Sequence, residues 1–327
     1  MEANRFLSHI RPVRWRLVVV LIVACIGTAL PGCSRWTNRR APARAFTSET
    51  PTASEIMAVV NGNAERAQSL PANDLDILVR QTGHHIAVPL RGKLALEKPR
   101  RFRLIATLPL GGTEADLGSN DNEFWCYVRR GAERPTLMHC SYAEYPRVRT
   151  SIPFQPDWIM ESIGLSPLPA EVQHTVQPGK RGTVEIVSPA TTPQGQPASK
   201  ITAVQLSSGC IVERRLEVAG NRIASAVLSR HRRDDVFGMV YPGSITISWP
   251  EAGLELGIDL DDVVVNAQFD ASTAARLWTI PLEDPDVKAA DKIDLGAPAR
   301  PALPARPSRV PVIPETWNHE GPARSRR

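Results

Sequence analysis

The sequence predicts a mainly β protein with some α-helix: a single curved antiparallel sheet of about eleven strands, an unclosed β-barrel covered by two or three helices. Between about residues 74 and 265, apolar and polar residues alternate in segments of roughly 5–9 residues that turn residues separate. Two other segments repeat apolar residues every three or four positions, as helices do. A sheet of that size needs its concave face covered, by closure or by helices. The hydrophobic content of 42% supplies enough apolar side chains for such a core.

Residues 1–32 have the pattern of a signal peptide. A basic stretch precedes an apolar run over residues 17–30, which at about 14 residues is short for a membrane span. The next residues make Leu30–Cys33 resemble the lipobox of bacterial lipoproteins, although Pro31 departs from the usual small residue. This resemblance implies cleavage before Cys33, acylation of Cys33 and anchoring to a membrane leaflet. A plain secretory signal and an uncleaved N-terminal anchor are the alternatives.

The positive charge of the chain lies outside its predicted folded part. The formal net charge is +5, but residues 46–295 alone carry a net charge of −6. Because a nucleic-acid-binding domain gathers positive charge on its folded face, no nucleic-acid partner is expected. For the arginines in the polar tether, residues 33–53, two placements are open: they lie against anionic lipid headgroups, or they are simply solvated. The Pro/Arg-rich tail, residues 296–327, has no periodicity and is predicted to be disordered.

The folded domain is predicted over residues 54–295. It opens with a helix from Ser54 to about Leu70, which Pro71 ends. A second helix begins at Pro156 and ends at Gly164, the expected positions of an early helical proline and a C-terminal glycine. The strands are predicted at 74–80, 86–96, 102–108, 114–117, 123–129, 136–140, 182–187, 201–206, 211–218, 223–230, 244–249 and 254–265.

Cys126 and Cys140 flank a predicted hairpin turn at residues 130–134. Folding the hairpin about Glu133 would bring the two cysteines opposite each other, so both a disulfide and two buried free thiols are open. With Cys210 they are spaced by 14 and 70 residues, which is no metal-ligand pattern. The sequence therefore predicts no metal site and no cofactor.

Four phrases of the sequence resemble bacterial LolA/LolB-like lipoprotein carriers. They are the opening helix at 56–70, the strand–Lys-Pro–strand phrase Gly92–Leu104, the turn and aromatic strand Leu117–Trp125, and the closing phrase Val264–Pro281. The order of a helix, a strand meander, an inserted helix and more strands is also similar to that family. The resemblance covers about residues 50–285. It implies a half-barrel with helices at its open side and an apolar cavity for acyl chains.

Inward-facing apolar side chains are the candidates for lining that cavity. They are Leu94, Leu96, Phe102, Leu104, Ile105, Phe124, Trp158, Ile159 and Ile163. The alternative for every one of them is simple core packing. Because carriers that work in solution are not anchored, Cys33 favours the acceptor-type, LolB-like lipoprotein. Ser34 in place of Asp after Cys33 agrees, by analogy with that family, with sorting to the periplasmic face of the outer membrane.

No pattern for catalysis is present in the sequence. It contains no Gly-x-Ser-x-Gly, phosphate-binding glycine loop, His-Glu-x-x-His or dinucleotide fingerprint, so an enzyme is not expected. The first hypothesis is a membrane-anchored envelope lipoprotein that binds acyl chains of lipids, such as palmitate, or of lipoproteins. The second is an anchored structural lipoprotein with a packed core, whose tail contacts another envelope protein.

Overall fold

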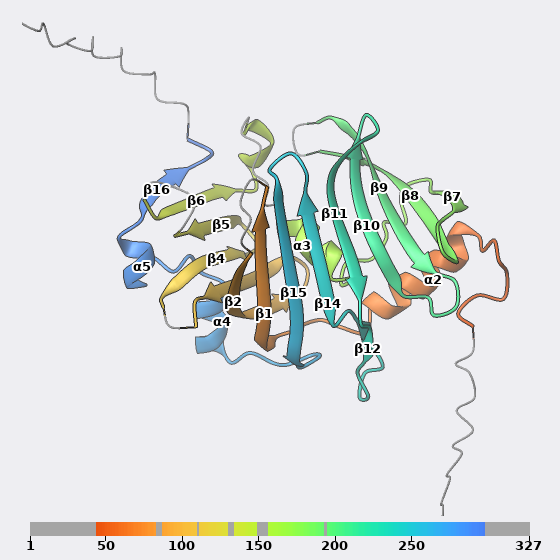
Figure 1. Ribbon diagram of the computed structural model, residues 1–327, viewed down its shortest axis with the longest axis horizontal. Coiled ribbons are helices and arrows are strands. Elements are labelled where there is room, and N and C mark those ends of the chain that lie inside the picture. Colours follow the sequence, from red (N-terminus) through yellow and green to blue (C-terminus); the bar gives the residue numbers. More distant parts are fainter. Residues whose placement is uncertain are drawn as a thin grey trace, which may run out of the picture. The chain divides into compact units, whose positions relative to one another are not determined.

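Figure 1 shows the computed structural model, which describes residues 44–82, 87–109, 111–129, 134–148, 156–192 and 195–297. Of residues 156 and 157 only the backbone is described. The predicted signal peptide with Cys33, and the tail from residue 298, lie outside this part of the chain. Within it, fourteen strands form one sheet and two short strands pair with each other.

The strands fall into two groups along the chain. The first group is β1 (Ala72–Gln81), β2 (Val88–Glu97), β3 (Arg101–Thr107), β4 (Thr113–Ser119), β5 (Glu123–Val128) and β6 (Thr136–Ser141). The second is β7 (Thr175–Pro178), β8 (Thr183–Thr191), β9 (Pro197–Gln205), β10 (Ile211–Val218), β11 (Asn221–Ser229), β14 (Ser244–Trp249) and β15 (Leu254–Val263). The hairpin outside the sheet is β12 (Arg232–Arg233) with β13 (Val240–Tyr241), and the last strand is β16 (Asp291–Asp294).

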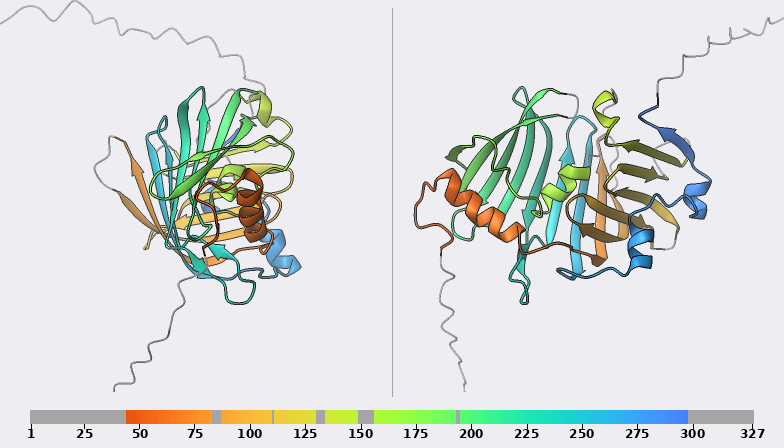
Figure 2. Two further views of the ribbon diagram at one scale, coloured as in Figure 1. Left: turned by 90° about the vertical axis from the view of Figure 1, so that its right-hand side faces the viewer. Right: turned by 180° about the vertical axis from the view of Figure 1, so that it is seen from behind.

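The sheet is curved and unclosed, as the sequence predicts (Figures 1 and 2). Its strand order is β16-β6-β5-β4-β3-β2-β1-β15-β14-β11-β10-β9-β8-β7, so β1 pairs with β15 in the middle and joins the two groups. Two details of the prediction were wrong: the sheet has fourteen strands, and β16 pairs with β6 in parallel. The prediction missed β7 and β16 because each has four mostly exposed residues without apolar alternation.

Helix α2 (Ala53–Ala64) begins with a capping box. The Thr52 hydroxyl accepts from the Glu55 backbone N–H, and the Glu55 carboxylate accepts from the Thr52 N–H at 2.7 Å. The helix ends at Ala64, six residues before the predicted end. The reason is a tertiary one, because the Leu70 N–H donates to the Leu96 carbonyl at 2.9 Å and draws this segment onto β2.

Helix α3 (Pro156–Ser162) ends two residues before Gly164, the predicted C-terminal glycine. Gly164 follows it with a φ of 85°, the left-handed conformation that a C-terminal glycine adopts without strain. Figure 2 shows α2 and α3 lying across the same face of the sheet, the concave one. A short 3₁₀ turn, η1 (Tyr145–Arg147), precedes α3 in the chain.

One large apolar cluster fills the space between the concave face and these two helices. It contains Ile56 and Val60 of α2 and Trp158 and Ile159 of α3, together with inward side chains of most strands. In β3 the burial pattern alternates strictly, so that Phe102, Leu104 and Ala106 are buried on this face. The cluster therefore holds both helices against the sheet through apolar contact.

The opposite face of β4–β6 is covered by the C-terminal strap, defined as residues 270–295. It contains α4 (Ala271–Leu277), α5 (Pro285–Lys288) and β16. A second, smaller apolar cluster joins the strap to the sheet, and it consists of Trp125, Tyr127, Leu137, Val287 and Ala290. Charges add to the attachment, because Arg129 pairs with Asp286 at 2.5 Å and Asp286 also accepts from the Thr113 N–H.

No helix among the described residues combines the length and the hydropathy needed to cross a membrane.

Candidate functional site

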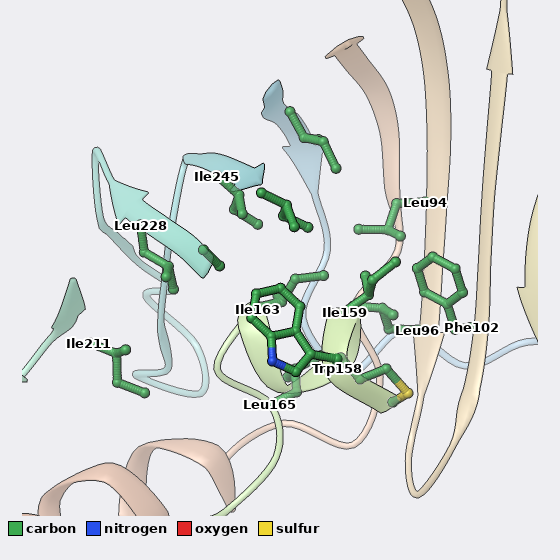
Figure 3. Close-up of a cluster of buried hydrophobic side chains, with 14 of the residues drawn as sticks. Leu94, Leu96, Phe102, Trp158, Ile159, Ile163, Leu165, Ile211, Leu228 and Ile245 are labelled. Atoms are coloured by element: carbon green, nitrogen blue, oxygen red, sulfur yellow. The ribbon is translucent and has the colours of Figure 1, made fainter. Parts of the chain in front are cut away.

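Eight of the nine predicted lining residues lie together on the concave face. Each is at most 5% exposed, and all belong to the large apolar cluster. They are Leu94, Leu96, Phe102, Leu104, Phe124, Trp158, Ile159 and Ile163. The strand register explains this, because Leu96 pairs with Phe102 across β2 and β3, and Leu94 pairs with Leu104. In Figure 3, Ile159 of α3 points toward Leu94, Leu96 and Phe102.

Ile105 does not join these residues. It follows Leu104 in β3, so its side chain lies on the other face of the sheet, where it is half-buried. Its cross-strand partner there is Asp116 of β4. The sequence argument counted Ile105 as inward because it stands in an unbroken run of apolar residues, and only strict alternation from Phe102 excludes it.

Cys126 and Cys140 are free thiols in the structure. The β5–β6 hairpin is centred one residue earlier than expected, so Cys126 pairs with Met138 and Cys140 pairs with Phe124. Diagonal neighbours in a sheet lie about 7–8 Å apart, which is too far for a disulfide. Burial raises the pKa of Cys126 to about 12 and that of Cys140 to about 11, so both remain protonated near neutral pH.

The first hollow in this region lies between α2 and the second half of the sheet, and we call it the α2 hollow. It has a volume of about 320 Å³. Its apolar wall includes Val59, Val60, Ile163, Ile211, Leu228 and Val240, and its polar wall includes Asn63, Arg66, His231 and Arg233. This combination of an apolar wall with a few polar groups is typical of small-molecule sites.

A second hollow lies on the other side of α3, and we call it the α3 hollow. Its volume is about 370 Å³, and Trp158 and Glu161 of α3 border it together with residues of β8, β9 and β10. One hollow therefore borders α3 at Trp158 and Glu161, and the other borders Ile163, the residue that follows the helix. The candidate site is the packed apolar core under α3, together with the two hollows that border it.

Two asparagines of α2 fix the helix over this core. The Asn61 side chain accepts from the Leu168 N–H at 2.7 Å and donates to the Leu168 carbonyl at 3.0 Å. Asn63 makes the same pair of bonds with the backbone of Val240, at 2.7 and 2.8 Å. The two clasps hold α2 to the segment after α3 and to the β12–β13 hairpin. Sequence alone could not assign their partners, which are 107 and 177 residues away.

The β12–β13 hairpin stands beside the α2 hollow. Arg66, two residues after α2, donates to the Gly238 carbonyl at 2.7 Å and so ties the end of the helix to the hairpin loop. The tip of that loop exposes two adjacent apolar side chains, Val236 at 81% and Phe237 at 45%. The bond at Gly238 is exposed to solvent, whereas the clasp at Val240 is partly buried.

His231 borders the α2 hollow and bonds to the Ile211 carbonyl at 2.8 Å. Burial lowers its pKa below the ordinary value of 6.5, and the bond to Ile211 opposes this only in part. Because the folded-state pKa is the lower one, the unfolded chain binds the proton first as the pH falls below 6.5. Stability is then lost progressively until the pH is below the folded-state value.

We therefore expect His231→Gln to reduce the acid sensitivity of the fold. Between about pH 7.5 and pH 5, the thermal unfolding midpoint of the unsubstituted protein should fall further than that of the variant. Thermal scans of both proteins across this range measure the difference. Parallel pH profiles would show that His231 is not the group responsible.

Among the described residues, no cluster of three or more His, Cys, Asp or Glu side chains could hold a metal ion. The two hollows have largely apolar walls with a few charged side chains at their margins.

Comparisons with known proteins give structural similarity at low sequence identity. No protein-family model and no curated protein sequence matches the chain. A DUF1329 family protein from Desulfovibrio piger is similar over 67% of this chain and 95% of its own, with a TM-score of 0.47 and 11% identity. A putative outer membrane lipoprotein-sorting protein domain from Vibrio parahaemolyticus is similar over 70% of this chain and 100% of its own, with a TM-score of 0.47 and 8% identity. A LolA superfamily protein from Nitrosomonas europaea is similar over 68% of this chain and 97% of its own, with a TM-score of 0.43 and 11% identity.

The described residues define the class of fold. It is a mainly β protein with a large curved, unclosed sheet, whose concave face is covered by two helices and packed with apolar side chains.

Proposed function

We propose that this protein is an envelope lipoprotein that is anchored through Cys33 and binds acyl chains under α3. Its ligands are lipids or the acyl chains of other lipoproteins, and it receives or carries them without chemistry. The anchor places it at the periplasmic face of the outer membrane. The single observation that carries the proposal is the apolar core on the concave face, which two helices cover and two hollows border.

The physical argument starts from the energy of an exposed acyl chain. Each methylene that leaves water contributes about 0.8 kcal/mol, so a protein that shelters a chain needs an apolar interior with a movable cover. Helix α3 has only seven residues, and the clasp between Asn61 and Leu168 ties the segment after it to α2. A hydrogen-bonded clasp of this kind contributes about 1 kcal/mol per bond, a small cost beside several buried methylenes.

The proposal predicts stoichiometric uptake of an amphiphile by the purified protein. Titration with a fluorescent fatty acid should saturate at one ligand per chain, and unlabelled palmitate or a diacylated lipopeptide should displace it. Displacement by the lipopeptide but not by palmitate would assign the site to lipoproteins. Absence of saturable binding for all three probes contradicts the proposal.

The close packing of the interior favours a second candidate function. The eight concave-face residues are at most 5% exposed, so the core is packed in the absence of a ligand. In that case the protein is an anchored structural lipoprotein, and the Pro/Arg-rich tail after Ala297 contacts an envelope partner. The titration separates the two functions, since a core that never opens takes up no acyl chain.

A further inference from the structure

Arg214 of β10 lies on the concave face, in a row of cross-strand neighbours that carries no other charge. Its cross-strand partners are Thr202 of β9 and Ala226 of β11, and the row continues to Ile186 and Ile247. All five side chains point to the concave face, and Arg214 is only 7% exposed. Arg214 is therefore the one charged side chain among these five neighbours.

The contacts of Arg214 differ sharply from those of its neighbour. Arg215 points to the other face and pairs with Glu185, Glu213 and Glu217 at 2.9, 3.1 and 3.5 Å. Arg214 makes no ion pair within the described part of the chain. Its one hydrogen bond there is a long one, 3.4 Å, to the Ser166 carbonyl, and its buried Nε has no partner.

Arg214 borders the α3 hollow, and the other charges of that hollow are already paired. Lys200 and Glu161 lie 2.5 Å apart and neutralise each other. The hydroxyl of Ser188, which also borders the hollow, bonds to His174. A positive charge therefore remains at Arg214, beside the apolar wall that Trp158 provides.

An unpaired buried guanidinium is costly for a protein, because its charge loses hydration without compensation. Burial accordingly lowers the pKa of Arg214, and the nearby Glu161 carboxylate opposes this in part. The group stays charged, since arginine does not lose its proton in proteins. Its planar fork of N–H donors matches a carboxylate or a phosphate, which would both satisfy the Nε and neutralise the charge.

We propose that Arg214 binds the anionic group, a carboxylate or a phosphate, of an amphiphile whose acyl chain lies under α3. This inference rests on the proposed acyl-binding function and adds the class of ligand, which is an anionic lipid. The buried location in the α3 hollow, the missing carboxylate partner and the unpartnered Nε carry it together.

The test compares anionic and neutral amphiphiles on the full-length protein. Palmitate and monopalmitoyl phosphatidic acid are the anionic probes, and monopalmitoylglycerol is the neutral one. We expect the unsubstituted protein to bind an anionic probe at least about tenfold more tightly than the neutral one. In Arg214→Met this preference should disappear, while affinity for the neutral probe stays within about threefold. The stronger of the two anionic probes identifies carboxylate or phosphate as the group recognised.

Two further variants make the result specific. Arg222→Met removes an exposed arginine of β11 and should leave the preference unchanged. Arg214→Lys keeps the charge but loses the planar fork, so it should retain only part of the preference. Arg214→Met should also unfold at the same or a higher temperature without ligand, because it removes an unpaired buried charge. An anionic preference that survives in Arg214→Met, or that the unsubstituted protein lacks, overturns the inference.

If no amphiphile binds at all, the proposed function fails. Titration with inorganic phosphate then tests separately whether Arg214 forms an anion site. A rise of the unfolding midpoint with phosphate that Arg214→Met abolishes supports an anion site without an acyl chain. No such rise overturns the Arg214 site as well.

Discussion

Gly118→Val should lower the free energy of unfolding by about 3 kcal/mol. Gly118 of β4 pairs with Trp125 of β5, and a Cβ added at Gly118 would overlap the indole ring. That ring is fully buried, and its Nε1 donates to the Asp116 carboxylate at 3.2 Å. A larger residue must displace the indole, break this bond and disturb the strap that packs on it. Urea unfolding of the variant measures the loss.

Gly62→Ala is the matched control for that variant. Gly62 lies within α2, and a Cβ there would meet no atom within 4 Å. Alanine favours a helix interior over glycine by up to about 1 kcal/mol, so this substitution should stabilise the protein slightly. A Gly118→Val variant as stable as the unsubstituted protein would contradict the tight approach of β4 to Trp125.

Trp158→Asp should abolish acyl uptake, reducing affinity by a factor of about one hundred or more. Trp158 is 5% exposed, belongs to the concave core and borders the α3 hollow. A carboxylate placed in this apolar space would cost several kcal/mol when an acyl chain displaces its water, and each 1.4 kcal/mol is a factor of ten. It would also compete with an anionic ligand for Arg214. The fluorescent fatty-acid titration measures the loss.

Two variants separate loss of the site from loss of the fold. Trp158→Phe keeps an apolar ring and should bind within about threefold of the unsubstituted protein. Ile105→Lys adds a charge on the other face of the sheet, opposite Asp116, and should leave uptake unchanged. Folding is checked by near-ultraviolet circular dichroism. A folded Trp158→Asp variant with normal uptake would show that the ligand does not lie under α3.

Periodicity predicted the parts of the fold in which local sequence and tertiary burial agree. In β3, the apolar run from Phe102 predicted the strand, and the structure confirms the strand, but the prediction placed Ile105 on the concave face beside Leu104 and this was wrong. Pro156 and Gly164 marked the second helix correctly. These features depend on residues that are close together in the chain.

The features that the sequence did not predict depend on contacts between distant segments. The strap was missed because β16 is exposed along its length and pairs with a strand about 155 residues away. Arg214 was missed because Arg214-Arg215 has the form of a solvated charged pair. Its spacing of two residues from the inward Leu216 was the available signal, since residues two apart share a face of a strand. The pairing of Cys126 with Met138 in place of Cys140 is a two-residue error in the β5–β6 register, and it is enough to exclude a disulfide.

The central claim is that an acyl chain occupies the space under α3, and native mass spectrometry tests it most directly. The protein and its Trp158→Asp variant are purified from a lipid-containing bacterial host under the same conditions. The account predicts a stoichiometric lipid adduct on the unsubstituted protein that is absent from the variant, with an anionic headgroup in the released lipid. A clean mass for the unsubstituted protein, unchanged after incubation with palmitate or a diacylated lipopeptide, would contradict it and leave an anchored structural domain.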